Sequence, residues 1–221
     1  MICPIPLGHI LFLYIMVDLF NYTRRASSVA HIGAIDLGGD NPIRIQSMTT
    51  TNTNDTEACV RQAEEIIKAG GELVRFTTQG SREAENMKNI NAGIRADGYQ
   101  TPLVADVHFN PNVADVAALY CEKVRINPGN YVDPARKFIK QEYTDEEYAH
   151  ELQKIEERFV PFLNICKENH TAIRIGVNHG SLSDRIRNRY GDTPEGIVES
   201  CLEFLRICKK ENFHDVVISI K

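Results

Sequence analysis

Charged and polar side chains recur at every second position in several short β-rich segments of this 221-residue chain. Alternate side chains of a strand share one face, so these residues would line one side of a sheet. A parallel sheet covered on both faces is normally apolar throughout, and unpaired buried charge is costly. The polar face therefore indicates a binding or catalytic site. Its candidate site residues are Arg75, Asp106, His108, Arg125, Asn127, Arg174, Asn178 and Lys221.

The basic side chains of this face indicate an anionic ligand. A guanidinium matches the oxygens of a phosphate group with two parallel hydrogen bonds, and positive charge focused in a pocket attracts polyanions. We therefore expect a small polyanion such as a diphosphate, although the formal net charge of the chain is −5. The alternative is that individual arginines are exposed or pair with a buried acid such as Asp106. The cations expected to converge are Arg44, Arg75, Arg125, Arg174 and Lys221.

Two turn segments follow predicted strands directly and could add to such a site. They are residues 127–130, with the sequence NPGN, and residues 178–181, with the sequence NHGS. Successive backbone N–H groups in a tight turn form concave anion-binding sites. Both turns could therefore present N–H groups to the ligand, although either turn alone is a weak signal.

The elements that position these residues alternate between strand and helix. Asp55 or Thr56, Asn110 before Pro111, Thr144 with Glu147, and Thr193 are good helix N-caps. The expected strands are 43–48, 73–77, 103–109, 123–127, 172–178 and 216–220, and a hairpin is expected over 29–39. The expected helices are 56–68, 81–96, 111–120, 144–167 and 194–210.

The alternation predicts an α/β fold with a parallel sheet and covering helices. A TIM-type (β/α) barrel explains why one face is polar, because such barrels place their chemistry at the carboxyl ends of the strands. We therefore expect a TIM-type barrel that is preceded by a short β-hairpin.

Composition excludes several classes of protein. Apolar residues make up 43% and charged residues 25%, which are ordinary values for a soluble globular protein and not for a disordered, fibrous or multi-span membrane protein. The excess of 30 acidic over 25 basic residues argues against sequence-independent nucleic-acid binding. The 6 cysteines form no CxxC pair, so we expect reduced, buried thiols of a cytoplasmic protein and no metal or cluster ligands.

The N-terminus carries an apolar run, Ile10–Val17, which is too short to span a bilayer. Three interpretations stay open. Translation could start at Met16, residues 1–15 could form an interfacial extension, or the run could be a targeting signal. No Lys or Arg precedes the run, which disfavours a signal peptide. We expect residues 1–21 to lie outside the fold.

Six segments carry a resemblance to a known family. They read IRIQSMTTTNTNDTEA, VRFTTQG, LVADVHF, VRINPGNY, RIGVNHGSLSDRI and DVVISIK, in this order. Over residues 22–221 the chain resembles the 4-hydroxy-3-methylbut-2-enyl diphosphate synthases of the methylerythritol phosphate route to isoprenoids. The resemblance implies a TIM-type barrel, of which this chain would hold about six of the eight strands. The long segment between Asn130 and Ala172 is similar to the three-domain form of the family.

The resemblance also implies an activity and its requirements. These enzymes reductively open 2-C-methyl-D-erythritol 2,4-cyclodiphosphate and release a hydroxyl group as water. Residues matching the family's substrate-binding cations are Arg75, Arg125, Arg174 and Lys221, with Asn178 beside them and Asp106 and His108 at the same mouth. A 4Fe–4S cluster is expected on a C-terminal domain that this chain lacks, so the fragment alone would be inactive.

Reduced ferredoxin or flavodoxin is the electron donor that the resemblance implies, and a homodimer is the implied assembly of the full-length protein. Neither a nucleic acid nor a membrane is an expected partner. Two alternatives stay open at this point. One is a non-redox diphosphate-binding barrel, such as a pterin-diphosphate transferase. The other is an inactive anion-binding fragment.

Overall fold

A curled parallel sheet of six strands forms the body of the molecule, in the order β3-β4-β5-β6-β7-β8. The computed structural model describes residues 25–133 and 142–221, so the N-terminal run lies outside the described residues. The predicted α/β partial barrel is confirmed. The strands are β3 (Gln46–Met48), β4 (Leu73–Thr78), β5 (Leu103–Val107), β6 (Lys123–Ile126), β7 (Ala172–Val177) and β8 (Val216–Ile220).

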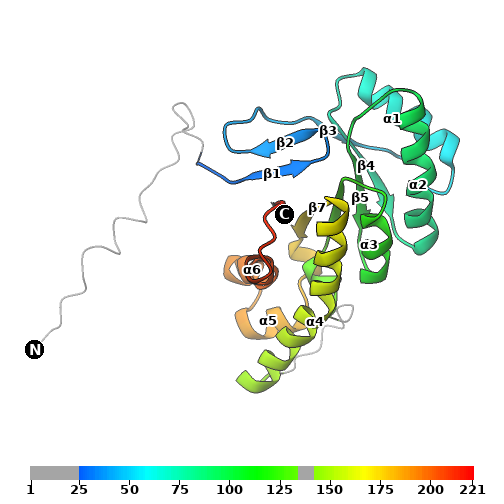
Figure 1. Ribbon diagram of the computed structural model, residues 1–221. Coiled ribbons are helices and arrows are strands. Elements are labelled where there is room, and N and C mark those ends of the chain that lie inside the picture. The colour runs from blue at the N-terminus through cyan, green and yellow to red at the C-terminus, as the bar shows by residue number, and fades with distance from the viewer. Residues whose placement is uncertain (1–24, 134–141) are drawn as a thin grey trace, which may run out of the picture.

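Helices connect the strands and follow one another around one side of the sheet (Figure 1). The connections after β6 and β7 begin with short 3-10 turns, η3 (Pro128–Asn130) and η4 (His179–Ser181). In the part of the chain that the structure describes, no helix is long and apolar enough to cross a membrane. The helices are α1 (Thr56–Lys68), α2 (Ser81–Ala96), α3 (Pro111–Ala118), α4 (Asp145–Asn169), α5 (Asp184–Tyr190) and α6 (Pro194–Lys210).

The predicted N-caps are confirmed. The Asn110 side chain accepts the N–H of Asn112 at 2.9 Å, and Thr144 and Glu147 form a reciprocal capping box. The helix after Thr144 is a single one that continues past Pro161 and ends at His170, whose φ of 55° is left-handed. Helix α5 was not predicted, because its residues show no apolar period and it has only 7 residues.

The apolar face of the sheet forms the main core against the helices. Val74, Phe76, Val124 and Ile175 are fully buried there. On the two edge strands the same face is uncovered among the described residues. Exposed fractions of 51–79% are found for Ile43, Ile45, Ile218 and Ile220. Residues 43–45 were expected in the first strand, but strand pairing begins only at Gln46.

A hairpin of β1 (Val29–Ile32) and β2 (Ile35–Gly38) covers the amino ends of the strands. Ile32 is buried in a second apolar cluster with Leu73, Val104 and Ala172, which lie on the inner face of the sheet. The inner face is therefore most polar toward the carboxyl ends of the strands. Its other end is an apolar layer beneath the hairpin.

Arg44 belongs to this closed end, and its predicted place at the mouth is wrong. Its Nη1 donates to Glu72 at 2.8 Å and its Nε to the Asp36 carbonyl of β2 at 2.9 Å. Arg44 precedes the first paired residue of β3, so alternation along the strand carries it to the amino end. There it holds the hairpin to the sheet.

Candidate functional site

Asp106 of β5 is the centre of a charged cluster on the inner face of the sheet. Its carboxylate is 1% exposed and accepts hydrogen bonds from Arg75 and, at 3.3 Å, from Nη1 of Arg125. Nε2 of His108 lies 3.0 Å from the same carboxylate. Burial alone would raise the pKa of Asp106. The hydrogen bond with His108 and the charges of Arg75 and Arg125 outweigh burial and lower this pKa to about 2.

The sheet register places the arginines of β6 and β7 side by side. Arg125 is level with Asp106 on one neighbouring strand and with Arg174 on the other. Nη2 of Arg125 also donates to the Gly176 carbonyl at 3.0 Å, and Nη2 of Arg174 donates to Oγ of Ser219 at 2.7 Å. Burial and the charges of Arg75 and Arg125 lower the pKa of Arg174. The guanidiniums therefore repel one another at close range.

Positive charge in the cluster exceeds negative charge. Among the described residues, Asp106 is the one carboxylate that pairs with Arg75 and Arg125, and Arg174 pairs with a neutral hydroxyl. The Nε of Arg75 is buried and has no hydrogen-bond partner. Buried donors normally have an acceptor, so this atom marks a place where an anion could supply one. The arrangement suits a ligand with several negative oxygens.

Lys123 is a member of this inner face that the sequence analysis missed. It is 2% exposed, and its Nζ donates to Oε1 of Gln46 at 3.1 Å. Burial and the charges of Arg174 and Arg75 lower its pKa to about 7. The alternation that selects Arg125 also selects the residue two positions earlier. Lys123 is the first residue of β6, and the predicted site included only residues near the carboxyl ends of the strands.

The side chains of the two predicted site asparagines, Asn127 and Asn178, cap the turns that follow them. Oδ1 of Asn127 accepts the N–H of Gly129 at 3.3 Å, and Oδ1 of Asn178 accepts the N–H of Gly180 at 2.9 Å. The prediction that these N–H groups face a ligand is therefore wrong, because the asparagine side chains occupy them. Nδ2 of Asn127 donates to Oγ of Ser181 at 2.9 Å, which joins the two turns.

The two turns also meet backbone to backbone. A Cβ atom at Gly129 would lie 1.8 Å from the Ser181 carbonyl oxygen, so glycine alone fits there. Lys221 follows β8 and is exposed. Its N–H donates to the Val177 carbonyl at 3.1 Å and its carbonyl accepts the His179 N–H at 2.8 Å, so it lies beside the second turn.

The Arg125 guanidinium lies where a side chain at position 176 would lie, and Gly176 leaves this space free. A Cβ atom there would lie 2.4 Å from Nε of Arg125. In Gly176→Ala the guanidinium must leave its place between Asp106 and β7, so we expect about a tenfold loss of affinity for inorganic diphosphate, measured calorimetrically on the intact protein. Gly180→Ala is the matched control, because its Cβ would meet only the Asn178 side chain at an ordinary 3.4 Å. Equal affinities in both variants would contradict this role of Gly176.

The cysteines of the described residues do not form a metal site. Cys59, Cys121, Cys166, Cys201 and Cys208 are buried. Burial raises the pKa of Cys201 to about 11 and that of Cys208 to about 12, which keeps both thiols protonated. Within residues 25–133 and 142–221, no group of three or more His, Cys, Asp or Glu side chains could hold a metal ion. Cys3 lies outside the described residues.

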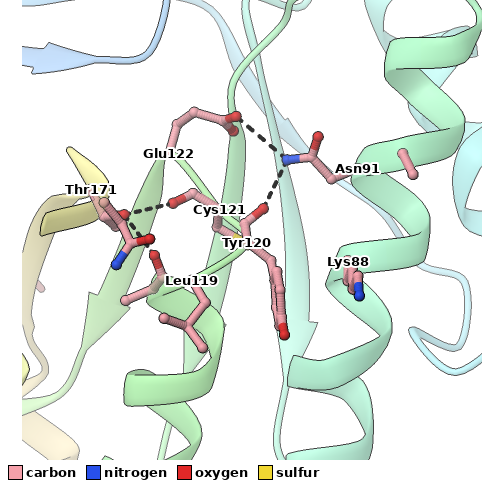
Figure 2. A pocket seen from close by; sticks show the side chains of 10 residues that line it. Lys88, Asn91, Leu119, Tyr120, Cys121, Glu122 and Thr171 are labelled. Atoms are coloured by element: carbon pink, nitrogen blue, oxygen red, sulfur yellow. Dashed lines mark hydrogen bonds between the residues drawn. The ribbon is translucent and has the colours of Figure 1, made fainter. Parts of the chain in front are cut away.

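A hollow of about 350 Å³ lies at the opposite end of the sheet, between the middle of α2 and the segment that follows α3 (Figure 2). Its polar groups pair with one another: Asn91 donates to the Tyr120 carbonyl at 2.8 Å, and Thr171 donates to the Ala118 and Cys121 carbonyls at 2.8 and 3.1 Å. Polar groups at the amino ends of barrel strands normally serve stability. The charged cluster around Asp106 is therefore the better candidate site.

Comparisons with known proteins agree with the fold. A family model described as the GcpE TIM-barrel domain matches residues 27–221. The chain is 77% identical over 205 residues to a protein of Phocaeicola vulgatus named 4-hydroxy-3-methylbut-2-en-1-yl diphosphate synthase (flavodoxin), covering 93% of this chain and 33% of that protein. A protein of Porphyromonas gingivalis with the same name is 53% identical over 206 residues, which are 93% of this chain and 35% of that protein.

The chain thus spans about a third of the length of the curated relatives it matches. Among solved structures, the chain is similar to a truncated 3-deoxy-D-arabino-heptulosonate 7-phosphate synthase from Thermotoga maritima. The TM-score is 0.53 at 10% identity, covering 87% of this chain and 56% of that one. At this identity the similarity concerns the fold alone.

Proposed function

Because the chain belongs to the GcpE TIM-barrel family, we propose that residues 22–221 form the substrate-binding barrel of a 4-hydroxy-3-methylbut-2-en-1-yl diphosphate synthase. The proposed reaction consumes 2-C-methyl-D-erythritol 2,4-cyclodiphosphate, two electrons and two protons. It yields 4-hydroxy-3-methylbut-2-enyl diphosphate and water, a step of isoprenoid biosynthesis. The names of the relatives favour this oxidoreductase over a non-redox transferase.

The observation that carries the proposal is the excess of buried positive charge around Asp106. A cyclic diphosphate brings two negative charges and several acceptor oxygens. Arg75, whose Nε has no partner, and the neighbouring Arg125 and Arg174 would bind those oxygens. Lys221 and Asn178 would contact the ligand from the mouth. Because folding has already fixed the guanidiniums in place, they need little reorganisation when charge shifts within the ligand.

The chain's own residues would bind and orient the substrate, and a redox cofactor would supply the electrons. The described residues provide no ligand set for an iron–sulfur cluster. We propose that a 4Fe–4S cluster is held by a region that is present in the relatives and that this chain does not span. The relatives' names suggest flavodoxin as donor, with ferredoxin as the alternative. We further propose that the full-length protein is a homodimer in the cytoplasm.

Two substitutions test the binding role. Arg125→Ala and Arg174→Ala each remove a charged donor worth roughly 1.5–3 kcal/mol, so each variant is expected to lose about tenfold or more in affinity for the cyclodiphosphate. Calorimetric titration of the intact protein measures this loss. Arg206→Ala is the matched control, because Arg206 is exposed and pairs with Glu199 on α6. Unchanged affinity in both site variants would overturn the proposal.

A further inference from the structure

Lys123 lies one layer below the arginines on the inner face of the sheet. In the register it is level with Val104 of β5 and Ala172 of β7, which belong to the apolar layer under the hairpin. Arg125, two residues later, is level with Asp106 instead. The lysine amine therefore lies between an apolar layer and the guanidiniums, almost without contact with solvent.

The surroundings of Lys123 disfavour an ammonium ion. The hydrogen-bond partner of Nζ is the neutral amide of Gln46, and among the described residues no carboxylate lies within ion-pair distance of Nζ. The charges that act on it are those of Arg174 and Arg75, and both are positive. Together with burial, they lower the pKa of Lys123 to about 7. Without a bound anion, burial and these two positive charges therefore favour the neutral amine.

The other charged groups on the elements packed around Lys123 have partners of their own. Asp106 of β5 is shared by Arg75, Arg125 and His108, and Ser219 is the neutral residue that β8 turns toward Arg174. None of these can supply Lys123 with a counterion unless the cluster rearranges. The paired groups near the hairpin are His31 with Asp36, Arg44 with Glu72, and Asp215 with the His31 N–H.

We propose that Lys123 takes up a proton when an anion binds to the arginines above it, so that ligand binding and protonation of Lys123 are coupled. The proposal rests on the anion site proposed above. Two negative charges placed against Arg75 and Arg174 cancel the repulsion that these residues exert on Lys123, and the ammonium form becomes favourable. The proton comes from solvent and returns to it when the site empties. Lys123 thus adds positive charge beneath the ligand only while the ligand is present.

The cyclodiphosphate is a suitable probe for this coupling. Each of its phosphates carries one strongly acidic group, so the charge of the ligand is constant around neutral pH. Any proton taken up on binding therefore enters the protein. Calorimetric titrations in two buffers with different ionisation enthalpies count these protons. At about pH 8, we expect the intact protein to take up roughly 0.9 protons per ligand, because an amine with a pKa of about 7 is then mostly neutral.

Lys123→Met is the main variant, since methionine matches the length of lysine and suits the apolar neighbours. Its expected proton uptake is near zero. The pH dependence should change with it: affinity of the unmodified protein should fall as pH rises above about 7, by up to about tenfold per pH unit, because binding then needs a proton that is scarcer. In Lys123→Met this part of the pH dependence should be absent.

His108 is the imidazole of the cluster and a second possible proton acceptor, so His108→Gln separates the two sources. Uptake that persists at about pH 8 in His108→Gln supports Lys123, and it does so even if Lys123→Met fails to fold. Uptake that vanishes in His108→Gln, or that persists in Lys123→Met, overturns the coupling. Binding without any proton uptake also overturns it while leaving the anion site intact. A protein that does not bind the cyclodiphosphate refutes the proposed function itself.

Discussion

Replacing Arg185 with methionine is expected to lower the free energy of unfolding by about 3–5 kcal/mol. Arg185 of α5 is 3% exposed and donates to both oxygens of Glu203 at 2.7 and 2.8 Å. It also donates to both oxygens of Asp133 at 3.0 and 3.3 Å. The substitution would leave two buried carboxylates without a cation. The Tyr148 hydroxyl, which donates to Glu203 at 2.5 Å, cannot neutralise the charge.

Urea unfolding of the intact protein measures this effect. Arg206→Met is the matched control, because it removes an exposed ion pair on α6 and should change the free energy of unfolding by less than about 1 kcal/mol. Arg185→Lys should recover only part of the loss, since an ammonium cannot reach both carboxylates with paired hydrogen bonds. A loss of less than about 1 kcal/mol in Arg185→Met would show that this network contributes little.

Asp106→Asn is expected to change stability and anion affinity in opposite directions. The folded pKa of about 2 lies below the ordinary value of Asp. The charged carboxylate therefore contributes stability that is fully present above about pH 4 and is lost as pH falls toward 2. At neutral pH, the variant should lose about 2–3 kcal/mol in the free energy of unfolding. Below about pH 3 the difference from the unmodified protein should shrink, because Asp106 is then becoming protonated.

The same substitution should strengthen binding of the cyclodiphosphate by roughly threefold or more, because it removes the carboxylate that pairs with Arg75 and Arg125. Denaturation across pH and calorimetric titration measure the two effects. Asp145→Asn is the control, since Asp145 is exposed and pairs with Arg189 at the surface. Weaker binding in Asp106→Asn would show that the main role of Asp106 is to orient Arg75 and Arg125. A stability loss that is as large at about pH 2 as at neutral pH would contradict the electrostatic explanation.

Alternation along the strands was enough to predict most of the charged cluster. Arg75, Asp106, Arg125 and Arg174 are all found on the inner face, because strand periodicity is a local property of the backbone. The same rule misplaced Arg44, and Lys123 was omitted because only the carboxyl ends of the strands were considered. Which end of a strand is open depends on the hairpin, and the hairpin's packing under the sheet is a tertiary feature that no local pattern contains.

The buried network of Arg185 could not be predicted either. The segment 184–190 contains three arginines, which is typical of an exposed helix face. Arg185 is buried because Asp133 and Glu203, distant in the sequence, converge on it. The positions of the turns after β6 and β7 were predicted correctly, but the hydrogen-bond partners of their N–H groups were not. The side chains of their asparagines accept hydrogen bonds from the turn N–H groups. Such local hydrogen bonds form as the chain folds, so these N–H groups are not available to a ligand.

The apolar layer of Ile32, Leu73, Val104 and Ala172 gives the binding face a blind end. A molecule that reaches Asp106 along the inner face cannot leave past this layer without displacing the hairpin, which the Asp215 carboxylate ties to the sheet through the His31 N–H. Ligand exchange through this end of the face is therefore blocked. An anion bound beside Asp106, and the water that it displaces, would therefore exchange with solvent away from the hairpin.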